Sequence, residues 1–386
     1  MTRGWTGALL APAAAGAFVG WMRTALFWIA AGLVACGTHE REGGTPYVEG
    51  EASSPDSSPP AMEVDTAWPP SLGDTLVLGE ITGIAVDQRD HVWILIPPDA
   101  LTEEEAAREP PVRRLPPVVE LDSEGRLVQG WEEVGGGYEW PRTPHGIFVD
   151  HRDRVWVGFR DTHLVLKYDR RGELLLTLGR HGETRGSNDS DHLGGPADIW
   201  VDPETDEVFV ADGYGNRRIV VYDAEFGNYL RHWGAYGERP DDEAAESDPR
   251  SQFSTAHGIV GSRDGLIYVA DRGNNRIQVF QRSGTFVQER FVAQETEGSG
   301  SAFDLALSPD PDQRFVYLVD GSNDAIWVLR RDDLSILGRF GETGPAPGAF
   351  RRPHNMDVDG EGHLYLGEVG NRGIQRILVR DEPGSH

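Results

Sequence analysis

Residues 253–280 read FSTAHGIVGSRDGLIYVADRGNNRIQVF, and this stretch decides the fold. Its Ile, Val, Tyr and Phe residues favour the pleated, half-buried surface of a β-sheet, whereas its Gly, Asp and Asn residues favour tight turns. The alternation predicts three short strands, at residues 257–260, 266–270 and 277–280, joined by two turns.

Five further segments repeat this unit along the chain. The residues that open the first strand of each copy lie 46 to 63 residues apart, and in chain order they are Thr82, His145, Ala197, His257, Phe303 and His354. Most copies continue into a third and a fourth strand. Four short strands that recur at this period are typical of a β-propeller, in which each repeat forms one blade. The sequence therefore predicts an all-β, six-bladed β-propeller.

The last copy ends near Arg380 after only three strands, so its fourth strand must come from elsewhere in the chain. The segment Leu72–Gly79, just before the first repeat, is the expected donor. An N-terminal strand would then complete the last blade and close the ring. Closure of this kind removes the exposed sheet edges that could pair with other chains.

Residues 1–36 have the features of a secretory signal peptide. From Met22 onward, one arginine and an apolar run too short to span a bilayer precede Cys36, the only cysteine in the sequence. The four residues that end at Cys36 read LVAC and resemble a bacterial lipobox, and Met22 is the expected start. We therefore expect an extracytoplasmic lipoprotein that contacts a membrane only through a lipid on Cys36.

Composition separates two further regions and limits the partners. Residues 37–70 are rich in Gly, Ser, Pro and Glu and are expected to form a flexible tether, followed by the propeller over residues 71–381. The chain has 36 basic and 63 acidic residues, a formal net charge of −27. That charge argues against nucleic acids and anionic membrane surfaces as partners. We expect a monomer that binds a small-molecule or peptide substrate in its central channel.

Histidine opens the innermost strand in every second copy, at His145, His257 and His354. Because innermost strands line the channel of a propeller, these imidazoles should approach the axis from three sides about 120° apart. A lone histidine more often has a structural role, but three of the 12 histidines occupy alternate anchor positions. Three imidazoles with open coordination positions are typical of a catalytic metal site, and zinc is the ion expected.

Loops that join second to third strands should share the rim of the histidines. Most of their Asp, Gly and Asn residues are explained by turn chemistry. Tyr214 and Arg272 are not required by a turn, and Arg160 occupies the corresponding loop of the second copy. A phenol and guanidinium groups beside a dication would supply acid–base and anion-binding groups.

Four segments that hold these residues resemble the peptidyl-α-hydroxyglycine α-amidating lyase family of NHL-repeat propellers, over residues 82–379. They are WPRTPHGIFVD, ADGYGNRRI, ADRGNNRIQ and RRPHNMDVDG. The resemblance implies that the three histidines hold a catalytic zinc, that Tyr214 is the base on the substrate hydroxyl and that Arg272 contributes to the site. It also implies a structural calcium, bound by the backbone carbonyls of Ile84 and Ile147 and by the side chain of Asn355, an amide where the family has a carboxylate.

The family also has an arginine just after the second strand of the first blade, where this chain reads ILIPP at residues 94–98. Arg160, and Arg108, Arg113 or Arg114 from the insertion that follows, are candidates to replace it. The resemblance implies cleavage of a carbon–nitrogen bond to give an amide and glyoxylate. Two alternatives remain: a non-catalytic NHL propeller that binds ligands or proteins, and a lactonase-like hydrolase on the same scaffold.

Overall fold

The computed structural model describes residues 58–70, 75–98, 101–132, 135, 140–244 and 249–380. The predicted signal peptide and Cys36 lie outside the described residues. Within the described part of the chain, no helix has both the length and the apolar character to cross a bilayer.

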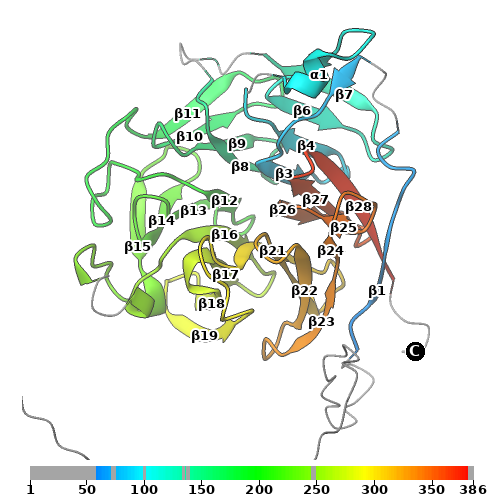
Figure 1. The fold of residues 1–386 in the computed structure, drawn as a ribbon. Helices are drawn as coiled ribbons and strands as arrows, with labels where there is room; N and C mark the ends of the chain where they lie inside the picture. Colours follow the sequence, from blue (N-terminus) through cyan, green and yellow to red (C-terminus); the bar gives the residue numbers. More distant parts are fainter. Residues whose placement is uncertain are drawn as a thin grey trace, which may run out of the picture. The chain divides into compact units, whose positions relative to one another are not determined.

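Six four-stranded antiparallel sheets form the blades of a propeller, as predicted (Figure 1). Their innermost strands contact one another in sequence around the axis, and the last of them contacts the first. From the inside outward, the first blade contains β3 (Gly83–Val86), β4 (Val92–Leu95), β6 (Val118–Leu121) and β7 (Leu127–Trp131), and the second contains β8 (Pro144–Val149), β9 (Val155–Phe159), β10 (Leu164–Tyr168) and β11 (Leu174–Gly179). The third contains β12 (Asp198–Val201), β13 (Glu207–Asp212), β14 (Arg218–Asp223) and β15 (Tyr229–Trp233), and the fourth contains β16 (Ala256–Gly261), β17 (Leu266–Asp271), β18 (Arg276–Gln281) and β19 (Phe286–Phe291). The fifth contains β20 (Ala302–Leu307), β21 (Phe315–Asp320), β22 (Ala325–Arg330) and β23 (Ile336–Phe340), and the sixth contains β26 (Pro353–Val358), β27 (Leu364–Glu368), β28 (Gly373–Arg380) and β1 (Ala61–Val64).

A repeated aspartate fixes the turn of several inner hairpins. In the first blade, Asp87 Oδ1 accepts hydrogen bonds from the backbone N–H groups of Arg89 and His91, at 2.8 and 3.1 Å, and Oδ2 accepts one from Trp93 Nε1 at 3.1 Å. Asp150 and Asp359 make the corresponding bonds in the second and sixth blades. Because a one-residue slip would turn every side chain to the other face, this bond helps to fix the register of the hairpin.

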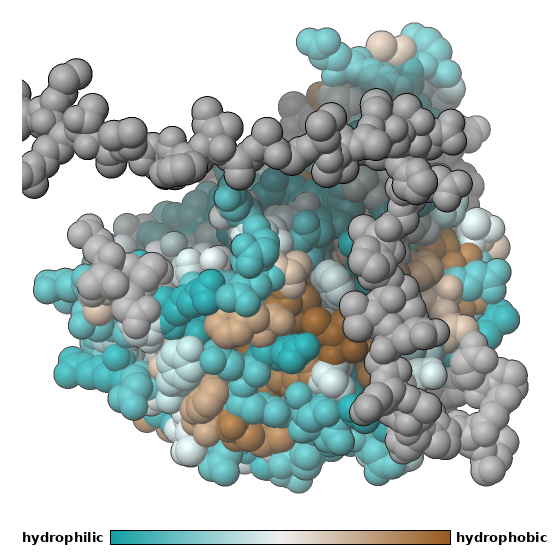
Figure 2. All heavy atoms as spheres, turned by 60° about the horizontal axis from the view of Figure 1, so that its bottom comes forward, coloured by the Kyte–Doolittle hydropathy of each residue, from teal (hydrophilic) through white to brown (hydrophobic). Residues whose placement is uncertain are grey.

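The hydrophobic core is distributed among six clusters, one between each pair of adjacent blades. The cluster between the first two blades contains Trp93, Trp131 and Tyr168, whose rings are 5.4–5.5 Å apart in succession. Large exposed apolar side chains such as Phe226 lie outside this core. Hydrophilic side chains cover much of the described surface in the view of Figure 2. The packing between blades therefore holds the innermost strands in place around the channel.

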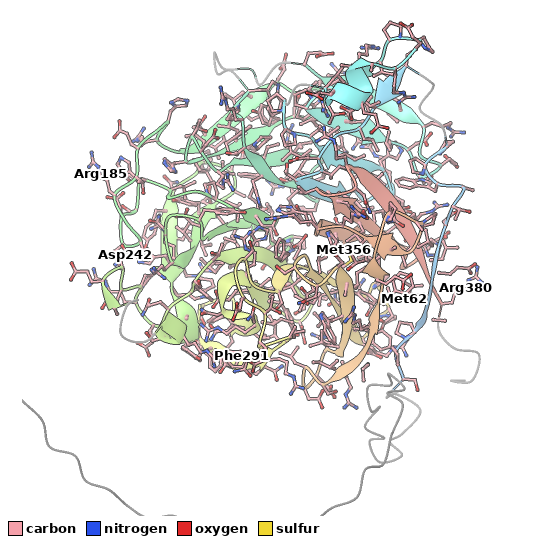
Figure 3. The ribbon with its side chains drawn as sticks, in the orientation of Figure 1. Met62, Arg185, Asp242, Phe291, Met356 and Arg380 are labelled. Atoms are coloured by element: carbon pink, nitrogen blue, oxygen red, sulfur yellow. The ribbon has the colours of Figure 1, made fainter. Side chains whose placement is uncertain are left out.

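The expected donor of the closing strand, Leu72–Gly79, is wrong. Strand β1 pairs with β28 instead, with Ala61 opposite Arg380 and Val64 opposite Ile377, so the sixth blade includes residues of the predicted tether (Figure 3). Met62 and Val64 pack against the core between the fifth and sixth blades. Two apolar residues in a Pro- and Ser-rich stretch are too weak a period-two pattern to identify from sequence. Leu76–Val77 forms β2, which pairs in parallel with β5 (Arg113–Arg114).

Contacts beyond β1 secure the closure. Asp65 forms an ion pair with Arg376 of β28. The indole of Trp68, 5 % exposed, lies edge-on to Tyr365 at 4.8 Å between ring centroids, and its Nε1 donates to Ser123 O of the first blade at 3.2 Å. The segment that follows β1 therefore links the last blade to the first.

We predict that Trp68→Ala lowers the free energy of unfolding by about 3–5 kcal/mol, because it removes a buried indole from the junction of the first and last blades. Phe226→Ala is the control, since Phe226 is 73 % exposed and the change should cost at most about 0.5 kcal/mol. Urea unfolding followed by tryptophan fluorescence and circular dichroism measures both. Equal stabilities of the two variants would contradict the role assigned to this junction.

Candidate metal centre

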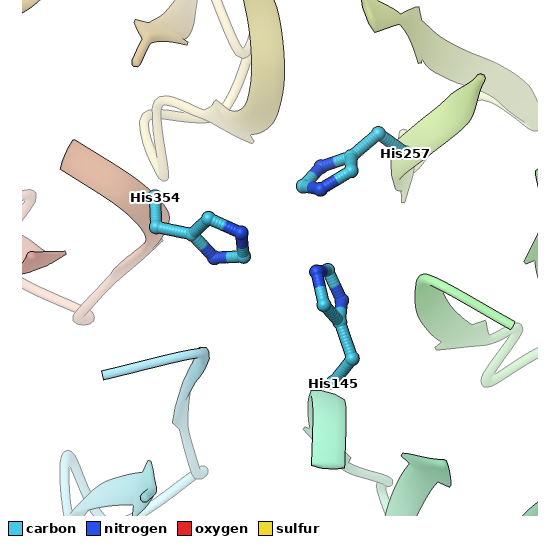
Figure 4. Close-up of side chains that lie close together, drawn as sticks. All are labelled: His145, His257 and His354. Carbon is cyan, nitrogen blue, oxygen red and sulfur yellow. The ribbon is translucent and has the colours of Figure 1, made fainter. Parts of the chain in front are cut away.

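His145 of β8, His257 of β16 and His354 of β26 converge at the centre of the ring (Figure 4). One ring nitrogen from each lies within 4.8 Å of the others. The ring centroids are 4.8, 4.8 and 5.1 Å apart, and all three side chains are buried. Alternate blades thus bring together three nitrogen donors, the number a catalytic zinc site commonly takes from the protein.

Each imidazole is oriented through its Nδ1 atom. His145 Nδ1 is 2.7 Å from Ala197 O, and His257 Nδ1 is 2.6 Å from Phe303 O. His354 Nδ1 bonds to Asn355 Oδ1. Since these oxygens only accept, every Nδ1 carries the hydrogen and every Nε2 keeps its lone pair. Partners of this kind fix the tautomer and direction of histidines that bind metals.

Burial keeps the imidazoles neutral. Desolvation lowers the pKa of His145 and of His257 well below the usual value of 6.5. Desolvation likewise lowers the pKa of His354 to about 4. The neutral imidazole is the form that binds a metal, so the three residues are ready to bind one at neutral pH.

Tyr214, in the loop after β13, places its hydroxyl among these nitrogens. The hydroxyl oxygen is 2.9 Å from His145 Nε2, 3.0 Å from His257 Nε2 and 3.1 Å from Arg272 Nη1, which donates to it. A hydroxyl has one hydrogen and can satisfy only one of the two lone pairs. No hydrogen bond among the described residues satisfies His354 Nε2. Hydrogen bonds among the described residues therefore cannot satisfy all three Nε2 lone pairs. A cation bound between the three histidines would satisfy them.

A cavity of about 380 Å³ opens next to Tyr214 and the histidines. Four arginines line it: Arg142, Arg160, Arg272 and Arg352. The guanidinium carbon of Arg160 is 4.6 Å from the Tyr214 ring centroid, and that of Arg272 is 5.2 Å from it and 5.0 Å from the Phe303 ring. The other lining residues are Glu80, Thr82, Pro97, Thr143, Pro144, His145, Tyr214, His354 and Val369.

Two of these arginines were not anticipated from the sequence. Arg142 and Arg352 lie three and two residues before the histidines of their blades, in the segments RTPH and RRPH. A basic side chain just before an innermost strand is carried to the same rim as its histidine. An arginine just before an innermost strand is therefore the sequence signal for both residues.

The structure separates the candidates for the missing first-blade arginine. Arg160 lines the cavity, whereas Arg108, Arg113 and Arg114 do not. Arg114 instead pairs with Glu105 at 3.1 Å and donates to Leu78 O at 3.2 Å. Glu105 belongs to α1 (Glu103–Ala106), which begins with a capping box at Thr102. Arg114 therefore holds α1 in the insertion and links the insertion to the segment before the first blade.

The residues implied for calcium do not fit that ion. The Asn355 amide is used at both ends, because Oδ1 accepts from His354 Nδ1 and Nδ2 donates to Asp304 Oδ2 at 3.2 Å. It contributes no negative charge, and carboxylates are the usual charged ligands of calcium. With Ile84 and Ile147 able to offer only backbone carbonyls, the three positions form a neutral set. Asn355 instead orients His354.

A second group of metal-type side chains, Asp87, His91 and Glu120, already has a cationic partner in Arg170. Arg170 pairs with Asp87 Oδ2 at 2.7 Å and with Glu120, and its guanidinium carbon lies 5.1 Å from the Trp93 ring centroid. Since Arg170 comes from the second blade and the other residues from the first, the group is an ion-pair network between blades.

We predict that the buried histidines make the metal-free protein less stable as the pH falls from about 6.5 towards 4, while the buried Asp304 and Asp357, whose pKa values burial raises to about 7 and about 6, act in the opposite direction. In this range the unfolded chain takes up protons that the buried, neutral histidines of the folded state do not. For His354 alone the loss at pH 5 is on the order of 2 kcal/mol, because its pKa falls from 6.5 to about 4. Between pH 7 and pH 5, the His354→Gln variant should therefore lose about 2 kcal/mol less of its free energy of unfolding than the unchanged protein.

Urea unfolding in the presence of a chelator, at pH 5 and pH 7, measures the slope. His181→Gln is the matched control, because His181 is exposed. A His354→Gln slope equal to that of the control and the unchanged protein would contradict the assignment.

Comparison with known proteins finds relatives named as amidating enzymes. The family model of the NHL repeat matches residues 253–280. Peptidyl-glycine alpha-amidating monooxygenase B of Xenopus laevis is 29% identical over 325 residues, which are 80% of this chain and 34% of that protein. The chain thus spans about a third of that relative. The probable peptidyl-alpha-hydroxyglycine alpha-amidating lyase of Caenorhabditis elegans is 26% identical over 311 residues, 78% of this chain and 83% of that protein.

Other relatives share the fold. NHL repeat-containing protein 3 of Homo sapiens is 25% identical over 277 residues, which are 68% of this chain and 73% of that protein. A solved streptogramin B lyase structure superposes with a TM-score of 0.51 at 12% identity, covering 83% of this chain and 98% of that one, and supports the propeller fold alone. The chain is a six-bladed β-propeller with an NHL repeat at residues 253–280, and its sequence resembles the amidating lyases.

Proposed function

We propose that this protein is a metal-dependent carbon–nitrogen lyase that converts a peptidyl-α-hydroxyglycine into a peptide amide and glyoxylate. The observation that carries the proposal is the position of the Tyr214 hydroxyl, 2.9 and 3.0 Å from the Nε2 atoms of His145 and His257. A proton-transfer group is thereby held next to three metal-binding nitrogens, inside a cavity lined by arginines. The relatives named as amidating lyases support the same reaction.

His145, His257 and His354 would hold the metal, and zinc is the ion that imidazoles and this coordination number favour. When bound there, a divalent ion polarises a coordinated hydroxyl. The chain's own residues supply the proton transfers. Tyr214, acting as the phenolate, takes the proton of the carbinol hydroxyl, whose oxygen then forms the carbonyl of glyoxylate as the C–N bond breaks. The departing nitrogen keeps the electron pair of that bond, receives the proton from Tyr214 and becomes the amide, which returns Tyr214 to the phenolate.

Arg272 and Arg160 hold the other charged part of the substrate. Arg272 donates to the Tyr214 hydroxyl and so orients the base. Both guanidinium groups lie beside the Tyr214 ring and line the cavity, where they can bind the carboxylate that becomes part of glyoxylate. Arg160 would take the place of the first-blade arginine. A cavity lined by imidazoles and arginines, with Glu80 as its one carboxylate, argues against the lactonase-like alternative.

We predict that zinc-loaded protein releases glyoxylate and an amide from an N-acylated dipeptide ending in α-hydroxyglycine. Tyr214→Phe should lower kcat by about 10²–10⁴-fold, because it removes a general acid–base group. Tyr222→Phe in the same blade is the matched control, since the buried Tyr222 hydroxyl has no hydrogen-bond partner. Product analysis by mass spectrometry and steady-state kinetics provide the readout. Absence of glyoxylate from metal-loaded protein would rule out the lyase and leave the non-catalytic alternative.

We also propose that the enzyme works outside the cytoplasm on a lipid anchor at Cys36, because the sequence before that residue has the form of a lipobox. Expression of the full sequence in a bacterium supplied with radiolabelled palmitate should label the protein and place it in the membrane fraction. Cys36→Ser should abolish both label and membrane association. Equal labelling of the two proteins would refute the anchor.

A further inference from the structure

The cavity beside the metal centre has an excess of positive charge. Arg142, Arg160, Arg272 and Arg352 line it, in a protein whose formal net charge is −27. Glu80 is its only acidic lining residue, and Glu80 lies 3.4 Å from Arg372, which is not among the lining residues. The positive charges of the four arginines are therefore not balanced by carboxylates of the described lining residues.

None of the four guanidinium groups forms an ion pair with a carboxylate of the described residues. Elsewhere on the same rim, arginines are paired, as Arg114 is with Glu105 and Arg372 with Glu80. Among the described residues, the buried donor Arg272 Nε has no hydrogen-bond partner. It is therefore available to an acceptor that enters the cavity with a ligand.

The arginines lie at two levels. Arg160 and Arg272 are half-buried and flank the Tyr214 ring, with guanidinium carbons 4.6 and 5.2 Å from its centroid. Arg142 and Arg352 are exposed, on the segments that enter the strands of His145 and His354. A carboxylate held beside Tyr214 accounts for the inner two. The outer two remain free for a second anionic group farther from the reacting carbon.

We infer that the enzyme prefers substrates with two anionic groups, namely peptides in which an acidic residue directly precedes the α-hydroxyglycine. This inference rests on the proposed lyase activity. The carboxylate of the hydroxyglycine binds Arg160 and Arg272, and the side-chain carboxylate of the preceding Asp or Glu binds Arg142 and Arg352. Guanidinium groups bind carboxylates through paired, charge-assisted hydrogen bonds, which makes arginine suited to both positions.

The test compares two N-acylated dipeptides that differ in one charge, with Glu or Gln before the α-hydroxyglycine. The expected kcat/KM is about tenfold higher for the Glu substrate at low ionic strength, and the ratio should shrink in 0.5 M salt because exposed charges are screened. The double variant Arg142→Gln/Arg352→Gln should bring the ratio close to one, because kcat/KM falls more for the Glu substrate than for the Gln substrate. Arg351→Gln, an exposed neighbour that does not line the cavity, is the control and should keep the preference.

Equal turnover of the two substrates, or a double variant that behaves like Arg351→Gln, would overturn the inference and leave the lyase activity intact. If neither substrate is cleaved, the lyase proposal fails. Calorimetry then tests whether the cavity binds two anionic groups, by titrating the metal-loaded protein with uncleavable analogues that end in Glu-Gly or Gln-Gly. Tighter binding of the Glu analogue, lost in the double variant, would support a two-anion cavity, and equal affinities would refute it.

Discussion

The hydrogen bonds that the backbone carbonyls of Ala197 and Phe303 accept from His145 and His257 are the constraint on which the site depends. Ala197 immediately precedes β12 and Phe303 lies in β20, so the carbonyls come from the third and fifth blades, whereas the imidazoles come from the second and fourth. One blade therefore aims the ring of the blade before it. The direction of each Nε2 lone pair is fixed by the packing of neighbouring blades, so the centre is as rigid as the ring itself.

His354 departs from this arrangement in an informative way. Its Nδ1 bonds to Asn355, the next residue along the chain, and Asn355 reaches across to Asp304 of the fifth blade. The Asn355 side chain thus orients the histidine of the sixth blade, whereas backbone carbonyls orient the histidines of the second and fourth blades. Because the Asn355 amide accepts from His354 and donates to Asp304, an uncharged side chain is enough to orient His354.

The periodic features of this protein could be predicted from its sequence. The spacing of the repeats indicated six blades, and the alternation of histidine at the anchors indicated three imidazoles near one axis. Features without a period could not be predicted in the same way. Strand β1 carries two inward apolar residues in a polar stretch, and its partner is more than 300 residues away in sequence. The sequence also does not show that Arg142 and Arg352 line one cavity, because they are 210 residues apart and only the fold brings their blades together.

The pairing of β1 with β28 has a consequence for how the propeller can be attached to anything else. Ala61 lies opposite Arg380, so the chain enters and leaves the ring at one outer corner of the sixth blade. The outermost strand of a blade is the one farthest from the central histidines. Anything joined to the propeller at either end is therefore attached to the outer edge of the sixth blade rather than to an innermost strand.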